Sequence, residues 1–430
     1  MRKFIRQFAE TSPVIYGLTL FLFFSAVFVS EIFGWDTLLI TAFLFAFLSA
    51  LYYYVFIHLK KNIVYDEFEE YLMNIDPDVS EAFTKYFSDN KGYQSLMQMG
   101  DIYSKIAFSE EMLEKILNGF NRFGLSKYSI FIMLLERSLY FYSKVIEEIP
   151  DSYWANFQLG NIYYHLNHFR DAKKYFTIAI ESKSTDSAPF YFRGLCNKHL
   201  NNLRSAQDDF TVAISLDPKY KEAYYTRGLI RYILHEYKNA IDDFEAFLTE
   251  SPDDAEILYF KGVSESQIKK YDTAIKSFTK ALKIMPDYKD ALKDRALTYY
   301  HLKRYDDALN DIDLSAKGEE NFHVYFIRGM IYLAQKKYLA AIAEYSHAKE
   351  MDPKVPEVYL ELAKVATEMG QKLEAINELD KALALNPYYI EALEMRGNLK
   401  IESGDLNGGK QDLDKVSDYR VNYYYDIASN

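Results

Sequence analysis

Cysteine is nearly absent from this chain of 430 residues, which contains only Cys196. A single cysteine excludes an intrachain disulfide, so the fold has to rest on packing. The chain also lacks the short motifs of catalysis, because no phosphate-binding glycine loop, zinc-binding His-Glu pair or nucleophile elbow occurs in it. We therefore predict that it is not an enzyme and has no catalytic residue, metal site or cofactor. One alternative is an enzyme whose site lies in residues 62–118.

Positive charge is also scarce. The net charge is −12, and residues 1–61 hold five bases and three acids, so the rest of the chain carries −14. Nucleic-acid binding depends on clusters of Lys and Arg that contact phosphates. The acidic balance therefore predicts no nucleic-acid partner, and nothing in the sequence indicates a small-molecule substrate.

Charged side chains are missing from two runs near the N-terminus, residues 14–30 and 37–57. Twenty-one helical residues rise roughly 31 Å, enough to cross a hydrocarbon core. Basic residues precede the first run and follow the second, and the link between the runs is acidic, which places both ends on the cytoplasmic side. Residues 1–61 are thus predicted to form a transmembrane helical hairpin with spans at about 13–33 and 37–57. The predicted localisation is the cell (inner) membrane, multi-pass, with the rest of the chain cytoplasmic.

Two other interpretations of the first run stay open. It has the basic start of a cleaved signal peptide, although Phe28 and Ser30 make a poor cleavage site. Alternatively, this shorter run dips into the membrane without crossing it. The rest of the chain would then lie on the opposite side.

A fixed period runs through the C-terminal two-thirds of the chain. A small residue returns every 34 residues, with one step of 33, at Gly160, Gly194, Gly228, Gly262, Ala296, Gly329, Ala363 and Gly397. A second small residue follows twelve positions later, at Ala172, Ala206, Ala240, Ala274, Ala308, Ala341, Ala375 and Gly409. A bulky residue stands four positions further on, at Phe176, Phe210, Phe244, Phe278, Ile312, Tyr345, Leu379 and Leu413. A period of this length predicts a solenoid, in which each unit buries its apolar face against its neighbours.

One unit, residues 221–254, predicts a pair of helices. Gly228 lies on the inner face of the first helix, and Ala240 and Phe244 lie on that of the second. Gly228 and Ala240 are small because the two helices cross at these positions. Pro252 ends the unit, as Pro218, Pro286, Pro353 and Pro387 end others.

These registers resemble the tetratricopeptide repeat (TPR) family over residues 153–417, as eight units. The resemblance implies an all-α fold, a TPR α-solenoid forming a right-handed superhelix of helix pairs, here preceded by the predicted hairpin. Residues 119–152 resemble a degenerate further unit, with Ser138, Tyr142 and Pro150 in register. Residues 62–118 are predicted to form a helical neck, and residues 418–430 a C-terminal cap.

Five units pair an arginine with an acid sixteen positions later. The arginines are Arg193, Arg227, Arg295, Arg328 and Arg396, and the acids are Asp209, Asp243, Asp311, Glu344 and Asp412. Three units have Leu159, Lys261 or Leu362 instead, and two of these also lack the acid. This co-occurrence predicts a structural ion pair between the two helices of a unit rather than a ligand site.

In the TPR family the first helices line a concave groove that takes peptides. The family's carboxylate clamp appears here only as the fragments Asn161, Lys293 and Asn398, so we exclude it. The groove positions are mostly aromatic or aliphatic and are predicted to bind an apolar or helical segment of a client protein. These residues are Phe157, Tyr164, Tyr191, Leu195, Tyr225, Leu229, Tyr232, Tyr259, Val263, Tyr300, Phe326 and Met330. The alternative is that these side chains only pack within the superhelix.

The sequence thus predicts a membrane-anchored TPR scaffold that recruits partner proteins to the cytoplasmic membrane face. A rival from another class is a structural component of a larger membrane assembly, such as a motor collar or secretion apparatus. Its contacts would lie on the outer faces of the repeats.

Overall fold

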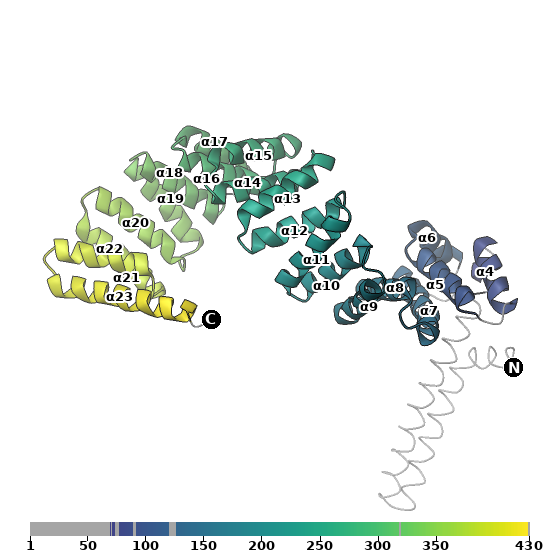
Figure 1. Cartoon of the computed structure of the whole chain (residues 1–430). Helices are drawn as coiled ribbons and strands as arrows, with labels where there is room; N and C mark the ends of the chain where they lie inside the picture. Colours follow the sequence, from purple (N-terminus) through teal and green to yellow (C-terminus); the bar gives the residue numbers. More distant parts are fainter. Residues whose placement is uncertain are drawn as a thin grey trace, which may run out of the picture. The chain divides into compact units, whose positions relative to one another are not determined.

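A computed structural model describes residues 69, 71–73, 77–88, 92–119, 126–317 and 320–428, with side chains as far as residue 419. These residues form helices joined by short turns, and no strand occurs among them (Figure 1). The chain divides into two compact units, Met1–Leu200 and Asn201–Asn430. Each unit is described by itself.

The first unit contains seven described helices. They are α4 (Pro77–Ser88), α5 (Tyr93–Ala107), α6 (Glu110–Gly119), α7 (Lys127–Glu148), α8 (Tyr153–His165), α9 (Phe169–Ser182) and α10 (Ser187–His199).

The second unit continues with thirteen described helices. They are α11 (Leu203–Leu216), α12 (Lys221–Ile233), α13 (Tyr237–Glu250), α14 (Ala255–Gln267), α15 (Tyr271–Ile284), α16 (Lys289–His301), α17 (Tyr305–Ser315), α18 (Phe322–Ala334), α19 (Tyr338–Met351), α20 (Pro356–Glu368), α21 (Lys372–Leu385), α22 (Ile390–Glu402) and α23 (Leu406–Ala428).

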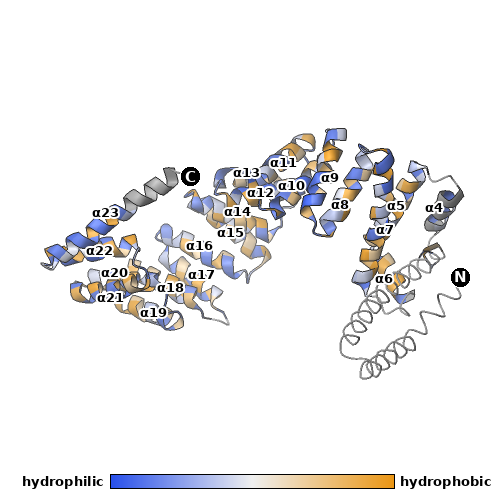
Figure 2. Ribbon diagram, turned by 90° about the horizontal axis from the view of Figure 1, so that it is seen from below, coloured by the Kyte–Doolittle hydropathy of each residue, from blue (hydrophilic) through white to orange (hydrophobic). Residues whose placement is uncertain are grey.

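Several of the helix pairs are built around an aromatic ring that covers a glycine. In the pair α12–α13, a Cβ atom added to Gly228 would lie 2.7 Å from the ring of Phe244, which is fully buried. The same closeness joins Gly262 to Phe278 at 2.7 Å and Gly329 to Tyr345 at 2.7 Å. Small residues at these positions are therefore required by the packing of the second helix on the first. Figure 2 shows hydrophobic and hydrophilic residues interspersed along the helices.

The turn that joins the two helices of a pair contains one residue in the left-handed backbone conformation. Six of these turns place a non-glycine residue at positive φ, namely Asn167, Asn201, His235, Lys269, Lys303 and Lys336, and two use Gly370 and Gly404. At Lys303, whose φ is 59°, the backbone N–H bonds to the carbonyl of Tyr300, and that of Arg304 bonds to the carbonyl of Tyr299. This is the Schellman arrangement, which satisfies the last carbonyls of the first helix.

A similar helix pair precedes residue 153, but with an inserted helix. Residues 126–152 contain one helix, α7, and its partner is α5. A Cβ atom added to Gly100 would lie 2.8 Å from the ring of Tyr142, and the Ser138 hydroxyl donates to the Gly100 carbonyl at 2.8 Å. The sequence prediction placed the degenerate unit within residues 119–152, whereas the paired glycine lies outside that range, with α6 between the two partners.

The predicted hairpin, residues 1–61 with spans at about 13–33 and 37–57, lies outside the described residues. Within the described ranges, no helix is long and apolar enough to cross a membrane. The longest of these helices, α7 with 22 residues and α23 with 23, both carry charged side chains along their length. The predicted localisation, a multi-pass protein of the cell (inner) membrane, is contradicted by this finding. We therefore do not assign the chain to a membrane.

Candidate functional site

The first helices of the pairs form the inner face of the second unit. Successive first helices contact one another from α12 to α20, whereas successive second helices of this unit make no contact of comparable extent in the described structure. A stack whose first helices lie closer together is curved toward them. Their exposed edges therefore make the inner face of the stack, which we call the inner face of unit 2.

Tyrosines and acids gather on this inner face around α14 and α16. The Tyr259 hydroxyl donates to the Asp294 carboxylate at 2.8 Å, and the Tyr259 and Tyr288 rings lie 5.0 Å apart. Burial raises the pKa of Asp294, and the hydrogen bond from Tyr259 offsets this only in part. Burial and the nearby Glu256 and other acids raise the pKa of Tyr288 to about 12. This part of the inner face is therefore acidic and partly shielded from water, and the edges of tyrosine rings surround the carboxylates.

The predicted groove residues divide between the two units. Phe157, Tyr164, Tyr191 and Leu195 belong to the first unit, and the other eight belong to the second. Val263 is buried and the remaining eleven are half-buried. All twelve side chains are thus partly or fully covered by neighbouring residues. A client protein could contact only their exposed edges.

The contacts of these residues explain their burial. Tyr225 packs on Phe247 with ring centroids 5.5 Å apart, and Tyr232 packs on Phe260 of the next repeat at 5.3 Å. Phe326 meets Tyr345 edge-on at 5.7 Å. Aromatic pairs at these separations are favourable in themselves. The inner-face side chains thus stabilise the stack in addition to offering a surface.

Sequence reasoning missed Ile233, the most exposed large apolar side chain on α12, with 54% of its surface accessible. It stands one helical turn after Leu229 and so on the same face. The signal was present in the sequence, since Ile233 occupies the place that His165, His199 and His301 occupy in other repeats.

Two of those histidines stack on aromatic rings. The His199 ring lies parallel to that of Phe169 with centroids 4.1 Å apart, and the His301 ring lies 5.3 Å from that of Tyr271. Burial lowers the pKa of His165 and of His199. In the described part of the chain, no group of three or more His, Cys, Asp or Glu is placed to hold a metal ion.

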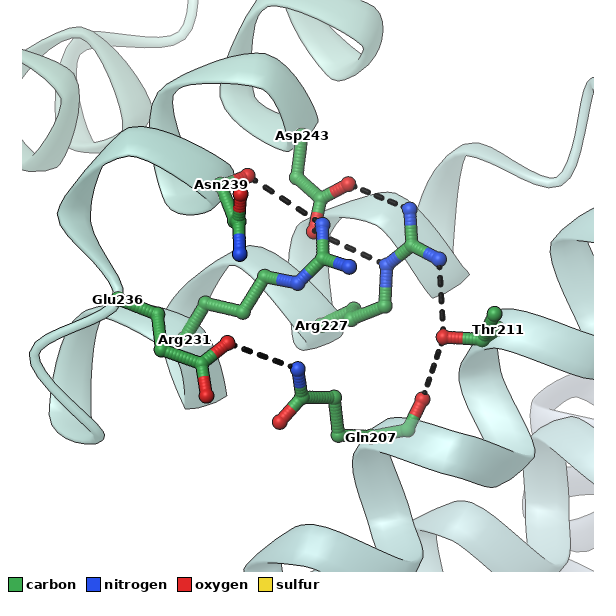
Figure 3. Close-up of polar contacts among 7 residues, drawn as sticks. All are labelled: Gln207, Thr211, Arg227, Arg231, Glu236, Asn239 and Asp243. Carbon is green, nitrogen blue, oxygen red and sulfur yellow. Dashed lines mark hydrogen bonds and ion pairs between the residues drawn. The ribbon is translucent and has the colours of Figure 1, made fainter.

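The predicted ion pair between the helices of a repeat is confirmed in unit 2. Arg227 makes two parallel bonds to Asp243, at 2.6 Å from Nη2 and 3.0 Å from Nε (Figure 3). Its third nitrogen, Nη1, donates to Thr211 Oγ1 on the preceding second helix at 3.0 Å. Arg231 also donates to Asp243, at 2.8 Å. One guanidinium thus joins three helices, which the sequence prediction did not foresee.

Other repeats of unit 2 have the same arrangement. Arg295 binds Asp311 through two bonds of 2.7 Å and Thr279 at 2.9 Å. Arg396 binds Asp412 at 2.7 and 2.8 Å and Asp380 at 2.6 Å.

Arg328 is held more loosely, since its bonds to Glu344 are 3.3 and 3.4 Å long. Burial raises the pKa of Glu344 despite this arginine. The predicted pair of Arg193 and Asp209 spans the two units and lies outside what is described of either.

The fourth repeat replaces the arginine pair with a different network. Lys261 stands in the arginine position, with its ammonium 3.1 Å from Glu245 and 3.2 Å from Glu265. The buried Glu265 carboxylate also accepts a bond of 2.7 Å from the Ser277 hydroxyl. The acid therefore comes from the first helix, one turn after Lys261, because the second helix offers only Ser277.

Comparison with known proteins identifies the repeats. Family models described as tetratricopeptide repeat match residues 155–186, 199–255, 268–313, 322–355 and 356–389. No curated protein sequence matches the chain.

Several solved structures are similar to parts of it. A tetratricopeptide repeat protein from Parabacteroides merdae is 19% identical, with a TM-score of 0.36, over 61% of this chain and 98% of that one. PilF of Pseudomonas aeruginosa is 19% identical, with a TM-score of 0.39, over 50% of this chain and 97% of that one. YrrB, described as a TPR protein with an unusual peptide-binding site, is 20% identical, with a TM-score of 0.32, over 51% and 95%.

The matched residues cover the helices α8 and α9, α11 to α13, α15 to α17 and α18 to α21. The chain therefore contains an all-α solenoid of tetratricopeptide repeats.

Proposed function

We propose that this chain is an interaction scaffold whose inner face in unit 2 binds a segment of a partner protein. The observation that carries the proposal is the row of half-buried aromatic and aliphatic side chains on successive first helices, continued by the exposed Ile233. Aromatic edges with a desolvated surround are the usual anchors of protein interfaces.

The charges near this row indicate the chemistry of the partner segment. Asp254, Glu256, Asp290 and Asp294 lie close enough to the tyrosines of α12–α16 to raise their pKa values, together with burial. An acidic surround favours a segment in which apolar residues alternate with Lys or Arg. The partner is thus an apolar segment, extended or helical, with a positive charge.

A crosslinking experiment in cells tests this site. A photoreactive benzoylphenylalanine replaces Ile233 in the full chain, and a matched control carries it at Lys238, which is exposed on the second helix of the same pair. The expected result is one partner crosslinked from Ile233 and not from Lys238. Equal capture from both positions, or from neither, would contradict an inner-face site.

Affinity for the crosslinked partner then measures the contribution of the side chains. Tyr225→Ser with Ile233→Ser should weaken binding by about 30-fold to a thousandfold, since an anchor contributes about 2 kcal/mol and every 1.4 kcal/mol is tenfold. Lys238→Ser with Asp242→Ser is the control pair on the outer face, and its affinity should equal that of wild type. Circular dichroism of each variant checks that helical content is unchanged.

A further inference from the structure

A pocket opens on the opposite side of the fourth repeat, between the second helices α13 and α15 and over α14. Its volume is about 690 Å³. Leu248, Leu258 and Ile275 form apolar walls, and Glu245, Lys261 and Glu265 contribute charged groups. Lys276 and Lys280 lie at its exposed edge.

The pocket exists because three residues are smaller here than in the repeat before. Leu258, Lys261 and Ser277 stand 34 positions after Tyr224, Arg227 and Asp243. In that earlier repeat the Arg227 guanidinium lies 5.6 Å from the centre of the Tyr224 ring and bonds to Asp243 and Thr211. The same space in the fourth repeat holds a thinner lysine and no aromatic ring. The pocket is therefore the space of a missing arginine.

The acid of this network also has fewer cations than two of its counterparts, Asp243 and Asp412. Asp243 binds two guanidinium groups, those of Arg227 and Arg231, and Asp412 binds Arg396 and Lys400. Glu265 is 4% exposed and has one cation, Lys261, together with the Ser277 hydroxyl. Glu245, whose side chain is 59% exposed, faces the same lysine from α13. Around Lys261 two carboxylates thus face one ammonium, so this part of the lining is locally negative, whereas Lys276 and Lys280 place positive charge at the exposed edge.

We infer that this pocket binds the guanidinium group of an arginine presented by a partner protein. The planar guanidinium matches carboxylate oxygens through parallel N–H bonds, and its methylene stem packs on apolar walls. Lys276 and Lys280 at the edge favour an acidic residue next to that arginine. The inference is independent of the inner-face site, because the lining residues come from the other side of the repeat.

The probe is N-acetyl-L-arginine amide, titrated into the full chain with labelled isoleucine and leucine methyl groups. The Ile275, Leu248 and Leu258 methyl signals should shift and saturate with a Kd on the order of 1 mM, as expected for one side chain. N-acetyl-L-citrulline amide has the same shape without the charge and should bind at least about tenfold more weakly. Absence of a saturable shift, or equal shifts with citrulline, would overturn the inference.

A variant that fills the pocket provides a second test. Leu258→Tyr with Lys261→Arg restores two of the three larger residues that the preceding repeat has, so it should fold and should no longer bind the probe. Glu265→Gln keeps the pocket open and removes the acid, and it should lose binding as well. Lys238→Arg, on the exposed side of α13, is the control and should bind as wild type does. Undiminished binding by either Leu258→Tyr/Lys261→Arg or Glu265→Gln would contradict the assignment.

Discussion

A single methyl group decides which residue can cover the crossing of each helix pair. Where an aromatic ring covers the crossing, as Phe244, Phe278 and Tyr345 do, the residue beneath it is glycine. Where an aliphatic chain takes that place, at Ile312 and Leu379, the residue beneath is alanine, Ala296 or Ala363. The eighth repeat is an exception, because Gly397 lies under Leu413 and also close to the backbone of Gly409. The two positions are therefore one steric unit, since the volume added on one side has to be removed from the other.

Gly228→Ala should destabilise the chain by about 1–3 kcal/mol, the usual cost of overpacking a core. The added Cβ would lie 2.7 Å from the buried Phe244 ring. Chemical denaturation of the full chain, followed by circular dichroism, gives the change in midpoint. Gly228→Ala with Phe244→Leu should lose less than the two single changes added together. Strict additivity would show that the two residues are independent.

The arginine pairs differ in what remains after one member is removed. Asp311 is 1% exposed and Arg295 is its cation, whereas Asp243 keeps Arg231 after the loss of Arg227. Arg295→Leu should therefore cost about 3–5 kcal/mol, as expected for a buried charge left alone, and Arg227→Leu distinctly less. The same denaturation experiment ranks the two variants. Arg295→Leu with Asp311→Leu should recover part of the loss, and no recovery would rule out coupling.

The raised pKa of Asp294 predicts how stability changes with pH. Because burial raises the folded pKa above the unfolded one, this group favours the folded state below the unfolded pKa, about 3.9. That contribution is lost as the pH rises through the folded pKa. Asp294→Asn should therefore raise the melting temperature at pH 7 and have little effect below pH about 3.9. The exposed Asp290→Asn serves as control, and an equal shift at both pH values would contradict the burial argument.

At the scale of the element, the helix pairs between residues 153 and 417 could be predicted from the sequence, whereas the α5–α7 pair could not. Eight registers repeat between residues 153 and 417, so errors at one position are corrected by the others. In the α5–α7 pair, α6 separates Gly100 from Ser138 by 38 positions instead of twelve, and the period fails. The exposure of the inner face was equally unpredictable, because burial of a ring such as Tyr232 depends on Phe260 of the next repeat. The pocket in the fourth repeat arises in the same way from residues of two repeats.

Gly370→Ala isolates the cost of the left-handed turn between α20 and α21. Its φ is +74°, and no atom lies within 4 Å of the added Cβ, so any loss comes from the backbone alone. An L-residue in this region costs roughly 1–2 kcal/mol. The reverse change, Lys303→Gly in the turn between α16 and α17, should be neutral or slightly stabilising. Glycine removes the strain of the positive φ, but it also loses more conformational entropy on folding than lysine does, so the two effects nearly cancel. Thermal unfolding of both variants measures the difference, and a fully tolerated Gly370→Ala would contradict the strain argument.

At the scale of the whole molecule, each repeat of unit 2 packs only on its neighbours, as in other solenoids. Damage to one repeat should therefore stay local. In Arg295→Leu, amide hydrogen exchange should quicken in α15–α18 and remain near wild type in α22 and α23. Mass spectrometry of peptides from each helix measures this pattern. Uniformly faster exchange across unit 2 would mean that the unit unfolds as one cooperative body.

The reach of each arginine to the preceding second helix has a mechanical consequence. These polar contacts, which we call braces, connect each repeat to the one before it. In unit 2 they are Arg227–Thr211, Lys261–Glu245, Arg295–Thr279, Arg328–Asp313 and Arg396–Asp380. The seventh repeat has Leu362 in this place, and a leucine cannot form such a brace. The joint at α20 is held there by the apolar cluster of Tyr345, Val358 and Leu362. Two long hydrogen bonds also cross this joint, from the Tyr345 hydroxyl to Glu361 at 3.3 Å and from the Tyr338 hydroxyl to Glu368 at 3.4 Å. Without a guanidinium brace, we expect this joint to bend more easily than the other joints of unit 2.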